Sequence, residues 1–527
     1  MKRLNLHAIP VVLLIVYSVV QLYCSSRLSL SYDESAFSDY GATLLKGIGA
    51  KDVRKYDSKL PITALHMLPR AVEQLLNPSL SKLNNEQDIR RGRWATLAAT
   101  MALAWMVYLW ARRLYGQWPA ILSITMFLLC PNFLAHGILV SSDIFACLFT
   151  FLAAYHAWKF CKAGSKYDFL IGSVSVGLGL ISKFSMVHLV VIYPMLILVS
   201  FLFQKVRTAW TAKKAITYLS AYLLIIWVIL SAAHLFYGMF LPFREYAFQS
   251  ALMQRLQLML PALPVPLPSS YIQSLDIVLY YDHLGGGLPG SINGATYLLG
   301  EQAVHGFWYY YLVAMWFKLP IATWMISILA IIFFFRNRSK NISAFFRDEF
   351  FLFLPVFYYL VYMSFFYSTQ IGIRHVLMVL PLLFVFSGSL LQKGRPVFLR
   401  YFLYGCLVFQ SISVGTYFPH FLPYTNEWII DKKKAYQKLA DTNICYGEGD
   451  QYLQAYLSKH PEALYLPERI TTGTVVMEVN EMLDLNSATI GKYSWVRKLE
   501  PVGHIHSQYL IFHVSQAAKD SLIFQKQ

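Results

Sequence analysis

Residues 215–238 read AITYLSAYLLIIWVILSAAHLFYG and contain no Lys, Arg, Asp or Glu. A helix needs about 20 mostly apolar residues to cross the hydrocarbon core of a bilayer. This run therefore predicts a membrane-spanning helix. Similar runs recur along the chain and predict an all-α polytopic membrane protein with about 11 transmembrane helices. The expected spans cover residues 8–25, 94–111, 118–137, 143–161, 168–182, 185–204, 215–238, 309–335, 350–367, 375–391 and 399–418.

The composition of the whole chain agrees with this interpretation. Of the 527 residues, 57% are hydrophobic and 14% are charged, whereas globular domains average roughly 45–50% and about 25%. So few charges cannot cover the surface of a soluble protein of this length, which excludes a soluble enzyme as well as a disordered or collagen-like chain. The six cysteines show no pairing framework and no CxxC motif, so the sequence indicates neither disulfides nor a zinc cluster.

The net charge of +17 is typical of a nucleic-acid binder, but the positions of the charges argue against one. Basic residues gather in the segments that join alternate spans, such as those around Arg112 and Lys213, whereas the short loops on the opposite side hold Lys183 and Arg374. By the positive-inside rule this pattern places the N-terminus in the cytoplasm and the C-terminus outside. We expect a multi-pass membrane protein whose first span is a retained signal anchor.

The expected organisation is a transmembrane domain over residues 1–419 and an extracytoplasmic domain over residues 420–527. The first domain has long outer loops at 27–93 and 239–308. Within the first loop, residues 60–76 are too short and too interrupted by proline to cross the membrane, so we expect an amphipathic helix in the outer interface.

The last 108 or so residues are expected to form a small α/β domain. Its expected elements are strands at 443–446, 474–479 and 508–514 and a helix at 450–459.

Charged residues at the outer rim of the predicted spans are the candidates for chemistry, because charges at the membrane edge are costly unless they serve a purpose. A carboxylate there can deprotonate an acceptor hydroxyl or amine. Cations there can hold the phosphate of a lipid-linked donor. The candidates are Asp33, Glu34, Lys59, Asp143, Lys183, Lys318, Arg374 and His375.

Each candidate also has a structural explanation. Asp33 and Glu34 are candidates for ordinary solvated loop residues, and Asp143 for the N-cap of its span. The three cations Lys183, Lys318 and Arg374 have side chains long enough to snorkel to lipid headgroups. His375 fits a packed interface residue as well as a functional one. The aromatic run 308–311 fits an interfacial belt as well as a sugar platform.

Several motifs, in their order along the chain, resemble the GT-C superfamily of membrane glycosyltransferases. The nearest resemblance is to its bacterial branch, related to protein O-mannosyltransferases and to the aminoarabinose transferase of lipid A. This resemblance implies a protein of the bacterial inner (plasma) membrane. The motifs are Tyr32-Asp33-Glu34-Ser35, Lys59-Leu60-Pro61, Ser142-Asp143, Gly179-Leu180-Ile181-Ser182-Lys183, Tyr297-Leu298-Leu299-Gly300-Glu301, Trp308-Tyr309-Tyr310, Lys318-Leu319-Pro320, Gly372-Ile373-Arg374-His375, Tyr493-Ser494-Trp495-Val496-Arg497 and Glu500-Pro501-Val502.

The resemblance implies roles for individual residues. Asp33, in the same acidic motif as Glu34, corresponds to the general base, and Asp143 to a second acid that orients the acceptor or a cation. Lys59, Lys183, Arg374 and Lys318 correspond to groups that hold the donor phosphate. Further candidates are His375, Glu301 and Tyr297.

The chain also departs from that pattern. Leu60-Pro61 lacks a second proline, and Cys445-Tyr446-Gly447-Glu448 stands where related bacterial proteins tend to have Asp-Trp-Gly-Gln.

The function expected from the sequence is that of an inverting glycosyltransferase at the outer face of the membrane. It would move a sugar from a polyprenyl-phosphate donor to a lipid, glycan or protein acceptor, among membrane lipids and without nucleic acid. A transporter or flippase of lipid-linked sugars is the alternative, and a non-catalytic partner in envelope assembly is a third. The absence of an internal repeat disfavours the transporter. No cofactor is indicated with certainty, although the outer acids leave a divalent metal possible.

Overall fold

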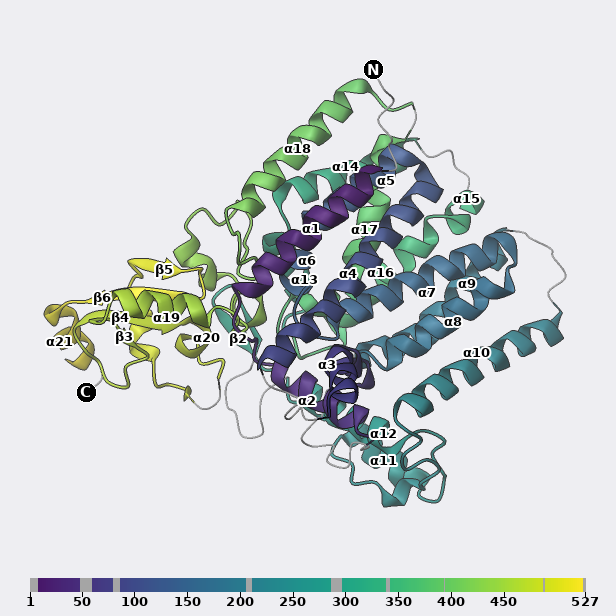
Figure 1. The fold of residues 1–527 in the computed structure, drawn as a ribbon, viewed down its shortest axis with the longest axis horizontal. Coiled ribbons are helices and arrows are strands. Elements are labelled where there is room, and N and C mark those ends of the chain that lie inside the picture. The colour runs from purple at the N-terminus through teal and green to yellow at the C-terminus, as the bar shows by residue number, and fades with distance from the viewer. Residues whose placement is uncertain are drawn as a thin grey trace.

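The computed structural model describes residues 8–47, 59–78, 86–204, 211–285, 296–337, 342–392, 394–486 and 489–524. Most of these residues are helical, and the long helices run side by side as a bundle (Figure 1). The helices are α1 (Ala8–Ser26), α2 (Glu34–Leu45), α3 (Ala64–Leu76), α4 (Glu86–Tyr115), α5 (Gln117–Leu128), α6 (Pro131–His136), α7 (Asp143–Ala163), α8 (Lys166–Leu180), α9 (Leu189–Gln204), α10 (Ala212–Ala233), α11 (Ala251–Met259), α12 (Ser269–His283), α13 (Tyr310–Lys318), α14 (Ile321–Asn337), α15 (Ile342–Arg347), α16 (Phe350–Phe365), α17 (Val379–Ser387), α18 (Val397–Gly415), α19 (Asp450–Lys459), α20 (Val479–Met482) and α21 (Gln516–Phe524).

Six helices of the described part of the chain are long and apolar enough to cross a membrane, or seven if the bent pair α13–α14 is one span. These are α1, α4, α7, the η2–α9 segment from Phe184, α10 and α18. Shorter apolar helices lie at α5, α16 and the segment Val379–Leu391. The helical membrane protein expected from the composition is therefore confirmed, and the number of 11 spans stays a prediction.

Two expected spans are broken at a proline. The span expected at 118–137 ends as α5 at Leu128, and a separate short helix, α6, begins at Pro131. The span expected at 309–335 bends by 115° between α13 and α14, where Pro320 follows Leu319. In both cases a proline cannot supply the N–H that a continuing helix needs, so the helix breaks.

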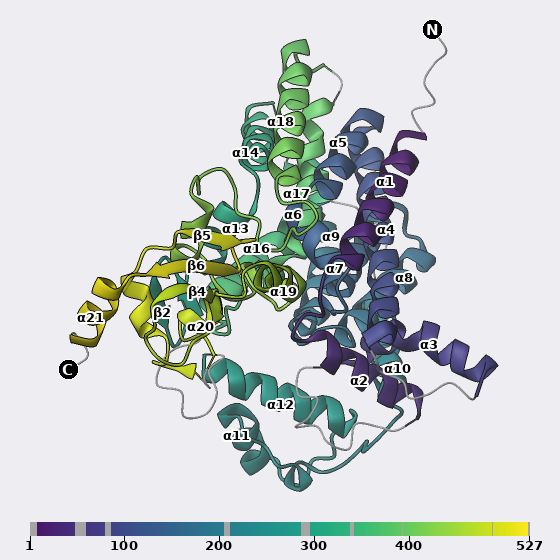
Figure 2. The ribbon, with the colours of Figure 1, turned by 60° about the vertical axis from the view of Figure 1, so that its left-hand side comes forward.

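The segments between the spans gather at the end of the bundle away from the N-terminus, where both views place α2, α3, α11 and α12 (Figures 1 and 2). The segment 60–76 is helical as expected: a 3₁₀ turn, η1 (Pro61–Thr63), leads into α3. A two-stranded hairpin, β1 (Thr296–Leu298) and β2 (Glu301–Ala303), precedes α13.

The C-terminal residues form a four-stranded sheet in the order β3-β4-β6-β5. The strands are β3 (Leu464–Tyr465), β4 (Gly473–Glu478), β5 (Gly503–Ile505) and β6 (Tyr509–Val514). The central pair is antiparallel, with Val475 opposite Phe512 and Met477 opposite Leu510. All four of these side chains are buried, which is the packing that holds the sheet. The strands expected at 474–479 and 508–514 and the helix expected at 450–459 are confirmed.

The prediction of a strand at 443–446 is wrong. A 3₁₀ turn, η7 (Asp441–Asn443), occupies its start, and irregular backbone follows. The backbone carbonyl of Asn443 accepts a hydrogen bond from the Lys318 ammonium, and its side-chain oxygen accepts one from the backbone N–H of Ile373. Polar groups that would form a strand ladder therefore bind the helical bundle instead.

Candidate functional site

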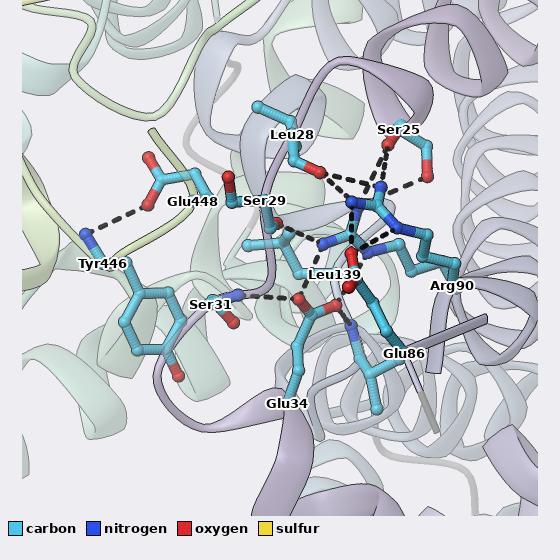
Figure 3. A network of polar contacts seen from close by, with 12 residues as sticks. Ser25, Leu28, Ser29, Ser31, Glu34, Glu86, Arg90, Leu139, Tyr446 and Glu448 are labelled. Atoms are coloured by element: carbon cyan, nitrogen blue, oxygen red, sulfur yellow. Dashed lines mark hydrogen bonds and ion pairs between the residues drawn. The ribbon is translucent and has the colours of Figure 1, made fainter. Parts of the chain in front are cut away.

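A buried ion pair fixes the segment that follows α1 to the bundle. Glu34, labelled in Figure 3, begins α2. Its two carboxylate oxygens accept hydrogen bonds from Arg93 of α4, at 2.9 Å from Nε and 2.7 Å from Nη2. The same oxygens accept the backbone N–H groups of Ser31 and Val140, each at 2.8 Å. Both charged side chains are fully buried. Glu34 is therefore neither solvated nor exposed to a substrate in this structure.

Asp33, the preceding residue, lies in a different environment. Its side chain is 34% exposed, and its Oδ2 atom accepts a hydrogen bond of 2.6 Å from the Tyr446 hydroxyl. The Arg374 guanidinium lies 3.4 Å from the same oxygen. The structure thus joins the expected base to a residue of the 3₁₀ turn η4 (Ile373–Val376) and to a residue of the C-terminal segment.

The surroundings of Asp33 keep its carboxylate ionised. Burial by itself would raise the pKa of Asp33, but the positive charges of Arg374 and Lys59, together with the hydrogen bond from Tyr446, hold that pKa below its usual value. Asp33 is therefore a carboxylate at neutral pH, which is the form that can accept a proton.

A second acid–base pair lies at the N-terminal end of α7. Lys183, which follows α8 and precedes η2 (Phe184–His188), places its ammonium 2.6 Å from Asp143. Asp143 is the first residue of α7, after the N-cap Ser142, so the N-cap explanation does not hold. The carboxylate also interacts electrostatically with Arg374. Asp143, Lys183, Arg374 and Asp33 thus form one group of alternating charges.

The other expected cations lie in different surroundings. The Lys59 ammonium lies 5.1 Å from the centroid of the Phe37 ring on α2, and its charge acts on Asp33. Lys318 is 2% exposed, and its ammonium donates to the backbone carbonyls of Leu422 and Asn443 at 2.6 and 2.7 Å. Lys318 therefore neither snorkels to the lipid nor faces Asp33, and instead fastens the C-terminal segment to α13.

The remaining candidates divide between the site and its periphery. His375 is buried beside Arg374, 5.5 Å from the Tyr367 ring, and the charges of Lys183 and Asp143 act on it. Tyr297 and Glu301 lie on the β1–β2 hairpin, Tyr297 buried and Glu301 exposed. No contact among the described residues connects either of these two to Asp33.

The structure adds residues to this region that were not predicted as candidates from the sequence, among them Arg93, Tyr446 and Asp441. Arg93 falls just before the span expected at 94–111, and a charge at a span end is the signal for it. Tyr446 sits where the sequence departs from its relatives. Asp441 interacts electrostatically with Arg374, and burial raises its pKa to about 6. Nothing in the local sequence of Tyr446 or Asp441 indicates that either lies near the first loop.

The surroundings of the two acids bear on the divalent metal that the sequence leaves possible. In the described ranges, no group of three or more His, Cys, Asp or Glu side chains is placed to hold one. Asp33 and Asp143 each face a cationic side chain instead.

A largely apolar cavity of about 430 Å³ lies elsewhere, between α7, α8, α9 and α10. Its lining includes Phe160, Tyr193, Phe201 and Tyr218, and none of the candidate residues.

Comparison with known proteins supports the predicted resemblance. The model of the dolichyl-phosphate-mannose-protein mannosyltransferase family matches residues 80–234, which carry Asp143, Lys183 and Arg93. This match confirms the resemblance to membrane glycosyltransferases. A search of the curated proteins finds no match.

Solved structures show a general likeness. The oligosaccharyltransferase of Archaeoglobus fulgidus in the apo form is 11% identical, with a TM-score of 0.44, over 86% of this chain and 60% of that one. The chain thus spans less than two thirds of the length of that protein. ArnT from Cupriavidus metallidurans is 12% identical in its apo state, with a TM-score of 0.33, over 96% of this chain and 98% of that one. The ArnT structure bound to undecaprenyl phosphate gives 13% identity and a TM-score of 0.30.

Proposed function

We propose that this protein transfers a sugar from a polyprenyl-phosphate donor to an acceptor hydroxyl or amine at the outer face of the membrane. The observation that carries the proposal is the partly exposed Asp33 carboxylate, kept ionised by Arg374 and Lys59. Arg374 also acts on Asp143, which is paired with Lys183. The match to a family named for dolichyl-phosphate-mannose supports a lipid-phosphate donor.

Asp33 acts as the general base in this proposal. The carboxylate takes the proton from the acceptor hydroxyl or amine while the acceptor atom forms a bond to the anomeric carbon of the sugar. The bond between that carbon and the phosphate oxygen breaks, and the polyprenyl phosphate leaves with the electron pair. A single in-line displacement of this kind inverts the anomeric configuration.

The cations near Asp33 stabilise the leaving group. Negative charge builds up on the phosphate as the bond breaks, and fixed positive charges nearby lower the energy of that state. Arg374, Lys59 and Lys183 are the proposed phosphate-binding groups. Arg374 offers a planar guanidinium suited to phosphate oxygens, while Lys183 must share its charge with Asp143.

The proposal is tested by Asp33→Asn in purified protein, with a labelled polyprenyl-phosphate sugar in detergent. The carboxamide keeps the shape of the side chain but cannot accept the proton, so transfer is expected to fall by at least a hundredfold. Asp39→Asn, an acid of the same loop on α2, is the matched control and is expected to retain transfer. Full activity of Asp33→Asn refutes the role of Asp33.

The same assay separates the alternative functions. An enzyme transfers or hydrolyses the sugar in detergent, whereas a transporter moves the lipid-linked sugar and requires sealed vesicles. Activity in vesicles alone refutes the transferase, and inactivity in both formats favours a non-catalytic partner in envelope assembly.

A further inference from the structure

Residues 446–448 of the C-terminal segment pair with residues 29–32, which precede α2. The backbone N–H of Tyr32 donates to the carbonyl of Tyr446, and the N–H of Ser29 donates to the carbonyl of Glu448, each at 2.9 Å. Between these two contacts lies Gly447, with φ of +86°. A Cβ atom at Gly447 would lie 2.6 Å from a ring carbon of Tyr32. The two segments therefore approach so closely that only glycine fits, and their register is fixed.

This pairing places the Tyr446 hydroxyl between Arg374 and Asp33. The hydroxyl accepts a hydrogen bond of 2.5 Å from Arg374 and donates one of 2.6 Å to Oδ2 of Asp33. The guanidinium also lies 4.7 Å from the centroid of the Tyr446 ring. Donation from a cation polarises the hydroxyl and strengthens its own donation to the carboxylate.

Both contacts to Asp33 fall on the same oxygen. Tyr446 and Arg374 each bind Oδ2, and in the described part of the chain no hydrogen bond to Oδ1 is found. The carboxylate is thus oriented through one oxygen, while the lone pairs of the other are available to accept a proton.

The buried carboxylate of Glu448 fixes the backbone of Tyr446. Glu448 accepts the backbone N–H of Tyr446 at 3.0 Å through Oε2 (Figure 3). Its Oε1 atom binds the His420 ring at 2.6 Å and the Gln508 side chain at 2.5 Å. Because Glu448 is fully buried and bound on both oxygens, the backbone at Tyr446 has little freedom to move.

We propose that Tyr446 is a positioning residue for the reaction: its hydroxyl fixes Oδ2 of Asp33 so that Oδ1 faces the acceptor hydroxyl or amine. The inference rests on the proposed function and goes beyond it, because it makes the C-terminal segment part of the site. Holding a base in a productive orientation lowers the entropic cost of reaching the transition state.

The test is Tyr446→Phe, which keeps the ring over Arg374 and removes the hydroxyl. We expect kcat to fall tenfold or more with the acceptor KM nearly unchanged. Since the lost hydrogen bond helps to lower the pKa of Asp33, the acid limb of the pH profile should move to higher pH.

The matched control is Tyr509→Phe. Tyr509 is a buried tyrosine of β6 whose hydroxyl also donates to a carboxylate, Asp450, at 2.5 Å, but it does not contact Asp33. Its loss should leave kcat and the acid limb in place. If Tyr446→Phe matches Tyr509→Phe in both readouts while Asp33→Asn is inactive, the positioning role is refuted and the proposed function stands. If Asp33→Asn is fully active, both are refuted.

A second variant guards against misfolding of Tyr446→Phe. Placing 3-fluorotyrosine at position 446 keeps the shape and makes the hydroxyl a stronger donor. The acid limb should then move to lower pH, and an unmoved limb overturns the inference.

Discussion

The Glu34–Arg93 ion pair allows a sharp test of how the segment between α1 and α4 is held. In Glu34→Gln, an NH₂ group replaces one carboxylate oxygen and cannot accept a hydrogen bond. If it replaces Oε2, the N–H of Ser31 and one of the two N–H groups on Nη2 of Arg93 lose their acceptor, while the other keeps its hydrogen bond to the Ser29 carbonyl. An unsatisfied buried donor costs about 1–3 kcal/mol, so two cost about 2–6 kcal/mol. Removing one partner of a buried ion pair costs about 3–5 kcal/mol in other proteins, which agrees.

The measurement is equilibrium unfolding in mixed detergent micelles, and the chain offers a matched control. Glu86 and Arg90 form an i,i+4 pair one turn away on α4, with side chains 61% and 33% exposed. Such exposed helical pairs contribute about 0.3–0.5 kcal/mol, so Glu86→Gln should change the free energy of unfolding by less than about 1 kcal/mol. If Glu34→Gln costs no more than Glu86→Gln, the structural role of Glu34 is refuted.

The comparison also separates structural loss from chemical loss. Glu34→Gln should lower stability and, with it, activity. Asp33→Asn should abolish transfer while the unfolding transition stays in place, because a partly exposed residue is changed at constant shape.

Three further outcomes follow from single contacts. Gly447→Ala should cost about 1–3 kcal/mol more than Gly473→Ala in the unfolding assay, because both glycines have positive φ but only a Cβ at 447 meets a side chain. Lys183→Met leaves the buried Asp143 carboxylate without its ammonium partner and should cost about 3–5 kcal/mol; adding Asp143→Asn should recover part of that loss. Asp441→Asn should raise the free energy of unfolding relative to wild type, and this gain should be larger above pH 6 than at pH 4. Burial raises the pKa of Asp441 from 3.8 to about 6, so the folded form holds that proton more tightly and stability is lost as pH rises from about 4 to 6. The loss is at most about 3 kcal/mol, since the residue is partly exposed.

Each of these outcomes has a result that contradicts it. Equal costs for the two glycine variants would mean that the close approach at 447 carries no energy. A double variant no more stable than Lys183→Met would mean that the unpaired carboxylate is not the cause. A pH-independent difference between wild type and Asp441→Asn would contradict the raised pKa.

The sequence was sufficient to predict much of the fold. Apolar runs as long as 215–238 predict membrane helices, because the bilayer imposes the same requirement on every span. The helix at 450–459 and the strands at 474–479 and 508–514 follow from local periodicity. The breaks at Cys130–Pro131 and Leu319–Pro320 were not predicted: the sequence was interpreted as continuous spans at both places, since proline is tolerated within many membrane helices.

The candidate site was predicted in its acids and cations but not in its pairings. That Asp33, Asp143, Lys183 and Arg374 gather at one end of the bundle agrees with their predicted position at the outer rim. That Glu34 is buried against Arg93, and that Lys318 holds the C-terminal segment, could not be predicted.

What the sequence determined by itself was therefore the membrane helices, the long segments between them and the residue types available for chemistry, because these depend on composition and short-range periodicity. Only the tertiary structure decided which of two adjacent acids is locked in an ion pair and which is exposed. Only the tertiary structure brought Tyr446 to Asp33 across 413 positions of the chain. The physical reason is that such contacts depend on the path of the backbone through every intervening helix and break, and no local pattern encodes that path.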